Sequence, residues 1–124
     1  MNIPRILIAA PSSGSGKTVI SCGLMAAFCR QQKNVVSCKC GPDYIDPMFH
    51  REVLGIDSQN LDLFFCEKEQ LTGIFAEHAK NADLAVVEGV MGYYDGMGLD
   101  TAKASSYDVA AALQIPVVLV VSAR

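Results

Sequence analysis

The chain has 124 residues, of which 51% are hydrophobic, and a formal net charge of −3. This length allows at most one domain, and the apolar content is enough for a buried core, which excludes an intrinsically disordered chain. The negative charge argues against a nucleic-acid partner, and no apolar run reaches the roughly 20 residues of a membrane helix. The chain starts without the features of a signal peptide, and its five cysteines lack disulfide or zinc spacing, which favours a reducing, cytoplasmic location.

Strands and helices are expected to alternate along the chain. Apolar runs predict four buried strands, at 6–10, 35–40, 82–88 and 116–121. Helical periodicity and capping signals predict the helices, at 17–32, 47–54, 67–80 and 105–113. Residues 56–65 fit either a short strand or an extended loop. The alternation predicts an α/β fold with a parallel sheet and flanking helices.

The last predicted strand is followed by only three residues, with no helix to cover it. A strand of a parallel sheet without a covering helix leaves apolar side chains open to water. We therefore expect the sheet to be incomplete at the C-terminus, and residues 1–124 to be the front part of a longer protein.

A phosphate-binding loop is predicted between the first strand and the first helix. A strand, a loop of small residues ending in Gly-Lys-Thr, and a helix form the arrangement of P-loop nucleotide-binding sites. Lys17 would reach the β- and γ-phosphates, and the Thr18 hydroxyl would hold Mg²⁺. Pro11 stands where the general motif has its first glycine, and an ordinary turn is the alternative interpretation. Backbone amides that would surround the phosphates belong to Ser13, Gly14, Ser15, Gly16, Lys17 and Thr18.

Acidic residues follow the second and third predicted strands. Asp43 and Asp46 come after the second strand, and Glu88 ends the third. Ligands of open α/β sheets bind beyond the carboxyl ends of the strands, so we expect all three acids near Thr18 as oxygen ligands for Mg²⁺. A buried Glu88 is costly without a function, whereas Asp43 and Asp46 flank prolines and fit a turn equally well.

Lys39 and a pair of tyrosines are further candidates at the same edge. Lys39 ends the second strand, where its ammonium could contact an anionic substrate or a phosphate. The alternative is an edge lysine whose ammonium reaches water. Tyr93 and Tyr94 lie in the glycine-rich segment 89–98 and could close over a substrate, or simply pack on their own loop.

Several segments together resemble the cobyrinic acid a,c-diamide synthases. The matching motifs are Ala10–Thr18, Lys39–Pro47, Asn60–Asp62, Glu88–Gly96 and Ser105–Asp108. Pro11 is normal in that family, and the Gly-Pro-Asp-Tyr-Ile-Asp-Pro segment is more specific than the P-loop. The resemblance implies a P-loop NTPase fold like that of dethiobiotin synthetase. It also implies ATP- and Mg²⁺-dependent amidation of the a and c carboxylates of cobyrinic or hydrogenobyrinic acid, through acyl phosphates and with ammonia from glutamine.

The same resemblance implies roles for particular residues. Asp43, Asp46 and Glu88 would serve the metal and the reacting carboxylate together with Lys17. Tyr44 and Ile45 would select the corrin side chain, with Lys39 and Tyr94 as further substrate contacts. The expected catalytic residues are therefore Lys17, Asp43, Asp46 and Glu88. The expected metal ligands are Thr18, Asp43 and Glu88, and the expected substrate-binding residues are Lys39, Tyr44, Ile45 and Tyr94.

The family's C-terminal glutaminase domain has no counterpart in these 124 residues. We therefore expect the chain to hold the phosphate and metal part of the site and to be inactive alone. Homodimerisation stays open. The alternatives are a dethiobiotin synthetase-like ligase for another carboxylate, and a partitioning or regulatory ATPase. Ser12 counts against a partitioning ATPase, because those proteins carry a lysine early in the loop.

Overall fold

The computed structural model describes residues 2–11, 16–41, 51, 54–61, 67–89 and 105–121. They form a five-stranded sheet in the order β3-β2-β4-β1-β5, in which all neighbouring strands are parallel. The strands are β1 (Arg5–Ala9), β2 (Val35–Cys40), β3 (Ser58–Leu61), β4 (Leu84–Glu88) and β5 (Val117–Leu119). The helices are α1 (Lys17–Arg30), α3 (Lys68–Ala79) and α4 (Ser106–Leu113). The predicted α/β class with a parallel sheet is confirmed.

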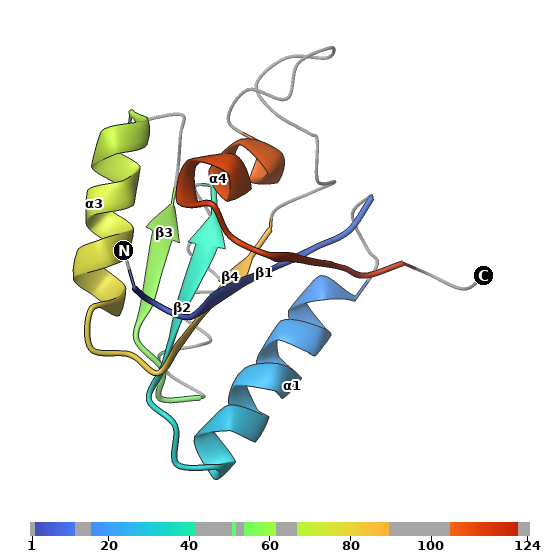
Figure 1. Cartoon of the computed structure of the whole chain (residues 1–124). Helices are drawn as coiled ribbons and strands as arrows, with labels where there is room; N and C mark the ends of the chain where they lie inside the picture. Colours follow the sequence, from blue (N-terminus) through green and yellow to red (C-terminus); the bar gives the residue numbers. More distant parts are fainter. Residues whose placement is uncertain are drawn as a thin grey trace.

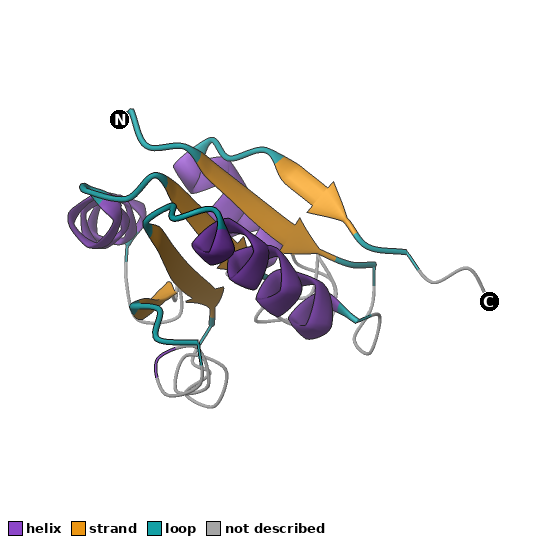
Figure 2. Cartoon of the chain, turned by 90° about the horizontal axis from the view of Figure 1, so that it is seen from below, coloured by secondary structure: helices purple, strands orange, loops and turns teal. Residues whose placement is uncertain are grey.

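Helices cover both faces of the sheet. Figures 1 and 2 show α1 across one face, with α3 and α4 on the opposite one. The strand β1 illustrates the alternation that this requires, because successive side chains of a strand point to opposite faces. Leu7 packs in the core under α3 and α4, whereas Ile8 packs with Met25 of α1. The sheet therefore has two apolar cores, and each strand residue can be assigned to a face by its position.

Local sequence signals explain the ends of the helices. At the start of α3, the Glu67 side chain and the Gln70 side chain bond to each other's backbone N–H groups, which forms a capping box. The Ser105 side chain accepts a hydrogen bond from the backbone N–H of Asp108 at 3.2 Å, as its predicted capping role requires. At the other end of α4, the Arg5 guanidinium donates to the Leu113 carbonyl at 3.0 Å and joins that helix to β1.

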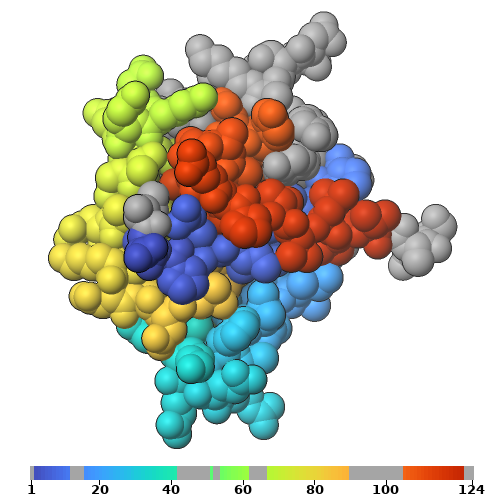
Figure 3. All heavy atoms as spheres, in the orientation of Figure 1, coloured from blue at the N-terminus to red at the C-terminus, as the bar shows by residue number. Residues whose placement is uncertain are grey.

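Two predictions for strands are resolved by the structure. The ambiguous segment 56–65 contains β3, which pairs with β2 alone among the described strands. The segment 116–121 does form a strand. Its apolar run predicted a buried strand, which is wrong, whereas the exposure agrees with the expectation that no helix covers this strand within residues 1–124. Val117, Val118 and Leu119 are 37%, 43% and 50% exposed, because β5 lies at the edge of the sheet beside β1. Figure 3 shows this red segment on the molecular surface.

The helices of the structure are short compared with a membrane-spanning helix. Within the described ranges, no helix combines the length and the apolar run that a bilayer crossing requires.

The predicted short helix at 47–54 falls almost entirely outside the described residues, apart from helical Arg51 and a turn at Leu54.

Candidate functional site

The first turn of α1 lies at the carboxyl end of β1. Gly16 caps the helix with φ +88°, a left-handed conformation that glycine adopts without a steric cost. As the N-cap residue, Gly16 has no side chain with which to bond these first backbone amides, which matches a helix start that is available to an anion. Lys17 is buried with 8% of its surface exposed, and Thr18 is exposed. The structure thus places the predicted phosphate-binding residues Gly16, Lys17 and Thr18 at the edge of the sheet where β1 ends.

Glu88 ends β4 at the edge of the sheet from which the chain leads to α1, and its side chain points to the face that α1 covers. It is paired in register with Ile8 on β1, one residue before that strand ends. Val86 belongs to the core under α1, and the side chain of Glu88, two residues later, points to the same face. The predicted proximity of Glu88 to the start of α1 is thus supported by both the register and the strand alternation.

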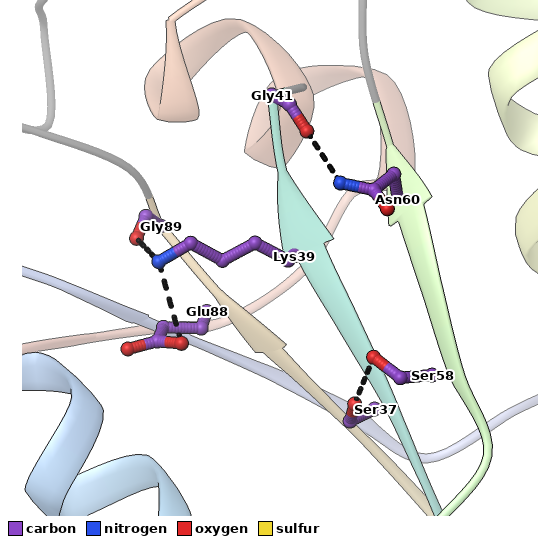
Figure 4. A network of polar contacts seen from close by, with 7 residues as sticks. All are labelled: Ser37, Lys39, Gly41, Ser58, Asn60, Glu88 and Gly89. Atoms are coloured by element: carbon purple, nitrogen blue, oxygen red, sulfur yellow. Dashed lines mark hydrogen bonds and ion pairs between the residues drawn. The ribbon is translucent and has the colours of Figure 1, made fainter. Parts of the chain in front are cut away.

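Lys39 and Glu88 form a buried ion pair between β2 and β4. The two residues are paired in register, and the Lys39 Nζ lies 3.3 Å from Oε2 of Glu88. The same ammonium donates a hydrogen bond to the Gly89 carbonyl at 3.1 Å (Figure 4). The side chains of Lys39 and Glu88 are 5% and 1% exposed. The alternative of a lysine whose ammonium reaches water is therefore wrong.

The exit of β4 is tightly packed against α4. The Gly89 N–H donates to the Ile8 carbonyl at 2.8 Å. A Cβ atom at Gly89 would lie 2.9 Å from the Ser106 Oγ and 3.1 Å from the Ile8 carbonyl oxygen. Burial raises the pKa of the neighbouring Cys40 thiol to about 12, although a hydrogen bond with Ser106 opposes that rise. The first turn of α4 therefore fixes where the chain leaves Glu88.

The exit of β2 is fixed by a second set of contacts. Gly41 has φ +81°, and its N–H donates to the Leu61 carbonyl at 2.8 Å. The Asn60 side-chain amide donates to the Gly41 carbonyl at 2.8 Å (Figure 4). The segment that was predicted to supply acids after β2 therefore begins at the same edge of the sheet as Glu88.

The structure describes five of the predicted site residues, namely Gly16, Lys17, Thr18, Lys39 and Glu88. It brings them to one edge of the sheet. The other predicted residues lie outside the described part of the chain: Ser13, Gly14, Ser15, Asp43, Tyr44, Ile45, Asp46 and Tyr94. Across the described ranges, no three His, Cys, Asp or Glu side chains gather as a metal cluster.

The donor chemistry of the described residues fits a hard cation such as Mg²⁺. Glu88 supplies a carboxylate and Thr18 a hydroxyl, and oxygen atoms are the ligands that Mg²⁺ prefers.

The sequence did not predict the pairing of Lys39 with Glu88 or the supporting roles of Asn60 and Ser106. Each of the two residues had a local signal, because each ends or nearly ends an apolar strand, but that signal does not indicate that β2 and β4 are neighbours.

Comparison with known proteins gives a consistent result. The family model described as "CobQ/CobB/MinD/ParA nucleotide binding domain" matches residues 6–120. A hydrogenobyrinate a,c-diamide synthase of Streptomyces coelicolor is 50% identical over 121 residues, which cover 98% of this chain and 25% of the relative. A cobyrinate a,c-diamide synthase of Methanocaldococcus jannaschii is 45% identical over 124 residues, which cover 100% of this chain and 28% of the relative.

A third relative extends the same pattern. A cobyrinate a,c-diamide synthase of Listeria innocua is 44% identical over 121 residues, which cover 97% of this chain and 27% of that protein. The chain thus spans about a quarter of the length of the curated relatives that it matches. The resemblance seen in the sequence motifs is confirmed over essentially the whole chain.

Proposed function

Since the chain belongs to the CobQ/CobB/MinD/ParA nucleotide-binding domain family, we propose that it binds Mg·ATP for the amidation of cobyrinic or hydrogenobyrinic acid. The observation that carries the proposal is the high identity to three named a,c-diamide synthases over nearly the whole chain. The gathering of Lys17, Lys39 and Glu88 at one edge of the sheet supports it, because this chemistry requires charged groups there.

The proposed extent of the site follows from the share of the relatives that is covered. Residues 1–124 would form the phosphate- and metal-binding part of an amidoligase domain. The glutaminase that supplies ammonia, which the family resemblance implies, would belong to the further length that the relatives have. The 124 residues alone would then not hydrolyse glutamine.

Each described residue has a proposed part in binding. The uncapped amides at the start of α1 and the Lys17 ammonium would hold the β- and γ-phosphates of ATP. Thr18 and Glu88 would hold Mg²⁺, together with Asp43 from the segment after β2. When bound, Mg²⁺ neutralises charge on the phosphate oxygens. Lys17 adds a second positive charge from a buried position, where electrostatic stabilisation is stronger than in water.

The proposed reaction overcomes the low reactivity of a carboxylate toward ammonia. An oxygen of the corrin carboxylate attacks the γ-phosphorus of ATP. The bond between that phosphorus and the bridging oxygen of the β-phosphate breaks, and ADP leaves. Ammonia then attacks the carbonyl carbon of the acyl phosphate, loses a proton, and expels inorganic phosphate to leave the amide. Lys39 would orient the substrate carboxylate, and Asp46, Tyr44, Ile45 and Tyr94 would complete the substrate contacts.

The proposal is tested by incubating the full-length protein with ATP, Mg²⁺, ammonium chloride and either cobyrinic or hydrogenobyrinic acid. Mass spectrometry should detect two amides for each corrin, and phosphate release should match amide formation. Lys17→Met should remove both signals, and Lys33→Met, at an exposed lysine beyond α1, should leave them unchanged. ATP hydrolysis that is stimulated by DNA or lipid, without any amide, would instead favour a partitioning ATPase.

A further inference from the structure

The Lys39–Glu88 pair has a consequence for metal binding. Lys39 places a positive charge 3.3 Å from the carboxylate that would also hold Mg²⁺. We propose that Lys39 is an internal counter-ion of Glu88 which Mg²⁺ must displace, so that metal binding releases the lysine amine toward the substrate. This inference rests on the proposed function and adds a coupling between the metal and Lys39.

Lys39 and Mg²⁺ would compete for the one carboxylate of Glu88. A Mg²⁺ ion on Oε2 of Glu88 would lie about 2.1 Å from that oxygen, so it would be within about 5.4 Å of the lysine Nζ where the structure has it. Both side chains are almost fully buried, and repulsion between like charges is strong where water does not screen it. Pairing of Glu88 with Lys39 and binding of Mg²⁺ to Glu88 therefore oppose each other.

The Lys39 side chain can leave Glu88 while its strand stays in place. The backbone of Lys39 is held in the ladder between β3 and β4, so the strand itself stays in place. The lysine stem has four rotatable bonds, and the ammonium can swing without a backbone movement. The same ammonium also donates a hydrogen bond to the carbonyl of Gly89, at the exit of β4 (Figure 4). Release of the ammonium therefore needs no change in the backbone pairing of β2.

The positive charge of a released Lys39 would need a new partner. A buried ammonium that loses its carboxylate needs another anion, because an uncompensated buried charge is strongly destabilising. A carboxylate of the corrin substrate, or an acyl phosphate formed from it, has the required charge. Metal binding would thus prepare the site for an anionic substrate, and by linkage the substrate would strengthen metal binding to the same extent.

The first test compares Lys39→Met with wild type. The thermal unfolding midpoint of the protein is followed as Mg²⁺ is added at saturating ADP, because a bound ligand raises it. Removal of the competing ammonium should lower the Mg²⁺ concentration for a half-maximal shift by about tenfold. The control is Lys80→Met, which breaks an exposed ion pair with Glu77 and should not change that concentration. An unchanged or higher concentration for Lys39→Met overturns the exchange.

The second test needs no variant, in case Lys39→Met does not fold. Wild-type protein is reductively methylated under two conditions, in the presence of ADP alone and in the presence of ADP plus Mg²⁺. The extent of methylation at each lysine is then quantified by peptide mass spectrometry. Methylation of Lys39 should rise several-fold with Mg²⁺, and that of Lys80 should stay constant. A constant signal at Lys39 overturns the exchange. If Mg²⁺ with ADP does not shift the wild-type midpoint at all, the proposed function itself fails, and the exchange with it.

Discussion

Ile8 and Glu88 are paired in the parallel ladder between β1 and β4, at the end of the sheet where β1 leads toward α1. This register brings an acid of one strand to the edge from which a glycine-rich turn starts. Alternation then directs the Glu88 side chain to the face that α1 covers. The strand order thus brings Glu88 to the edge of the sheet from which the chain leads to α1, although 70 positions separate it from Thr18 in the sequence.

Gly89→Ala should destabilise the protein. The added methyl group would meet the Ser106 Oγ at 2.9 Å and the Ile8 carbonyl at 3.1 Å, and the latter belongs to the backbone and cannot move aside cheaply. Overpacking of this kind costs about 1–3 kcal/mol in the free energy of unfolding. Chemical denaturation of the two proteins measures the difference.

The matched control for that change is Gly73→Ala. A Cβ atom at Gly73 meets nothing within 4 Å, and the residue lies within α3. Alanine there should stabilise the protein by about 0.5–1 kcal/mol. Equal effects of the two substitutions would contradict the close packing of Gly89 against α4.

Ser105→Ala should remove the cap of α4. The Ser105 side chain is buried and accepts a hydrogen bond from the Asp108 N–H. Loss of such a cap costs about 1 kcal/mol in the free energy of unfolding, as measured by urea denaturation. Thr72→Ala is the control, since its hydroxyl donates to the Lys68 carbonyl within α3 and the substitution should not lower stability. A comparable loss for both variants would refute the capping role.

Alkaline pH should weaken the fold through Cys40. Burial raises the pKa of this thiol from 9.0 to about 12 in the folded chain, and the unfolded chain regains the ordinary value. Between these values the folded state binds more protons than the unfolded one. Stability that is present below pH 9.0 should therefore be lost as the pH rises toward 12, by at most about 1.4 kcal/mol per pH unit for this group.

Urea denaturation at several pH values above 9.0 measures that slope. Cys40→Ala should make the slope shallower than in wild type, whereas Cys29→Ala, at an exposed position on α1, should leave it unchanged. Identical slopes for wild type and Cys40→Ala would show that the buried thiol does not contribute.

Sequence patterns predicted most of the sheet because its central strands are continuous apolar runs. The bounds of β2 match the prediction at both ends. The segment around β3 was ambiguous, since Ser58, Gln59 and Asn60 are polar and give no apolar signal. Tertiary contacts decide its conformation: the Ser58 and Ser37 hydroxyls are hydrogen-bonded at 2.7 Å in a buried position. A single sequence does not contain that partnership.

The site was predicted in its parts but not in its connections. The Gly16-Lys17-Thr18 turn and Glu88 were identified because each has a local pattern. The pairing of Lys39 with Glu88 depends on β2 lying next to β4, and strand order is not encoded in the local pattern of either strand. The exposure of Val118 has the same origin, because β5 lies at the edge of the sheet.

The proposed function requires that the turn which contains Lys17 binds Mg·ATP. Isothermal titration of Mg·ATP into wild type and into Lys17→Met measures the affinity of this turn. Lys17 is buried at the start of α1, and loss of its charge-assisted contacts with the phosphates should weaken affinity by about tenfold to a hundredfold. Lys33→Met, at an exposed position, should bind as tightly as wild type. Equal affinities for wild type and Lys17→Met would contradict the account.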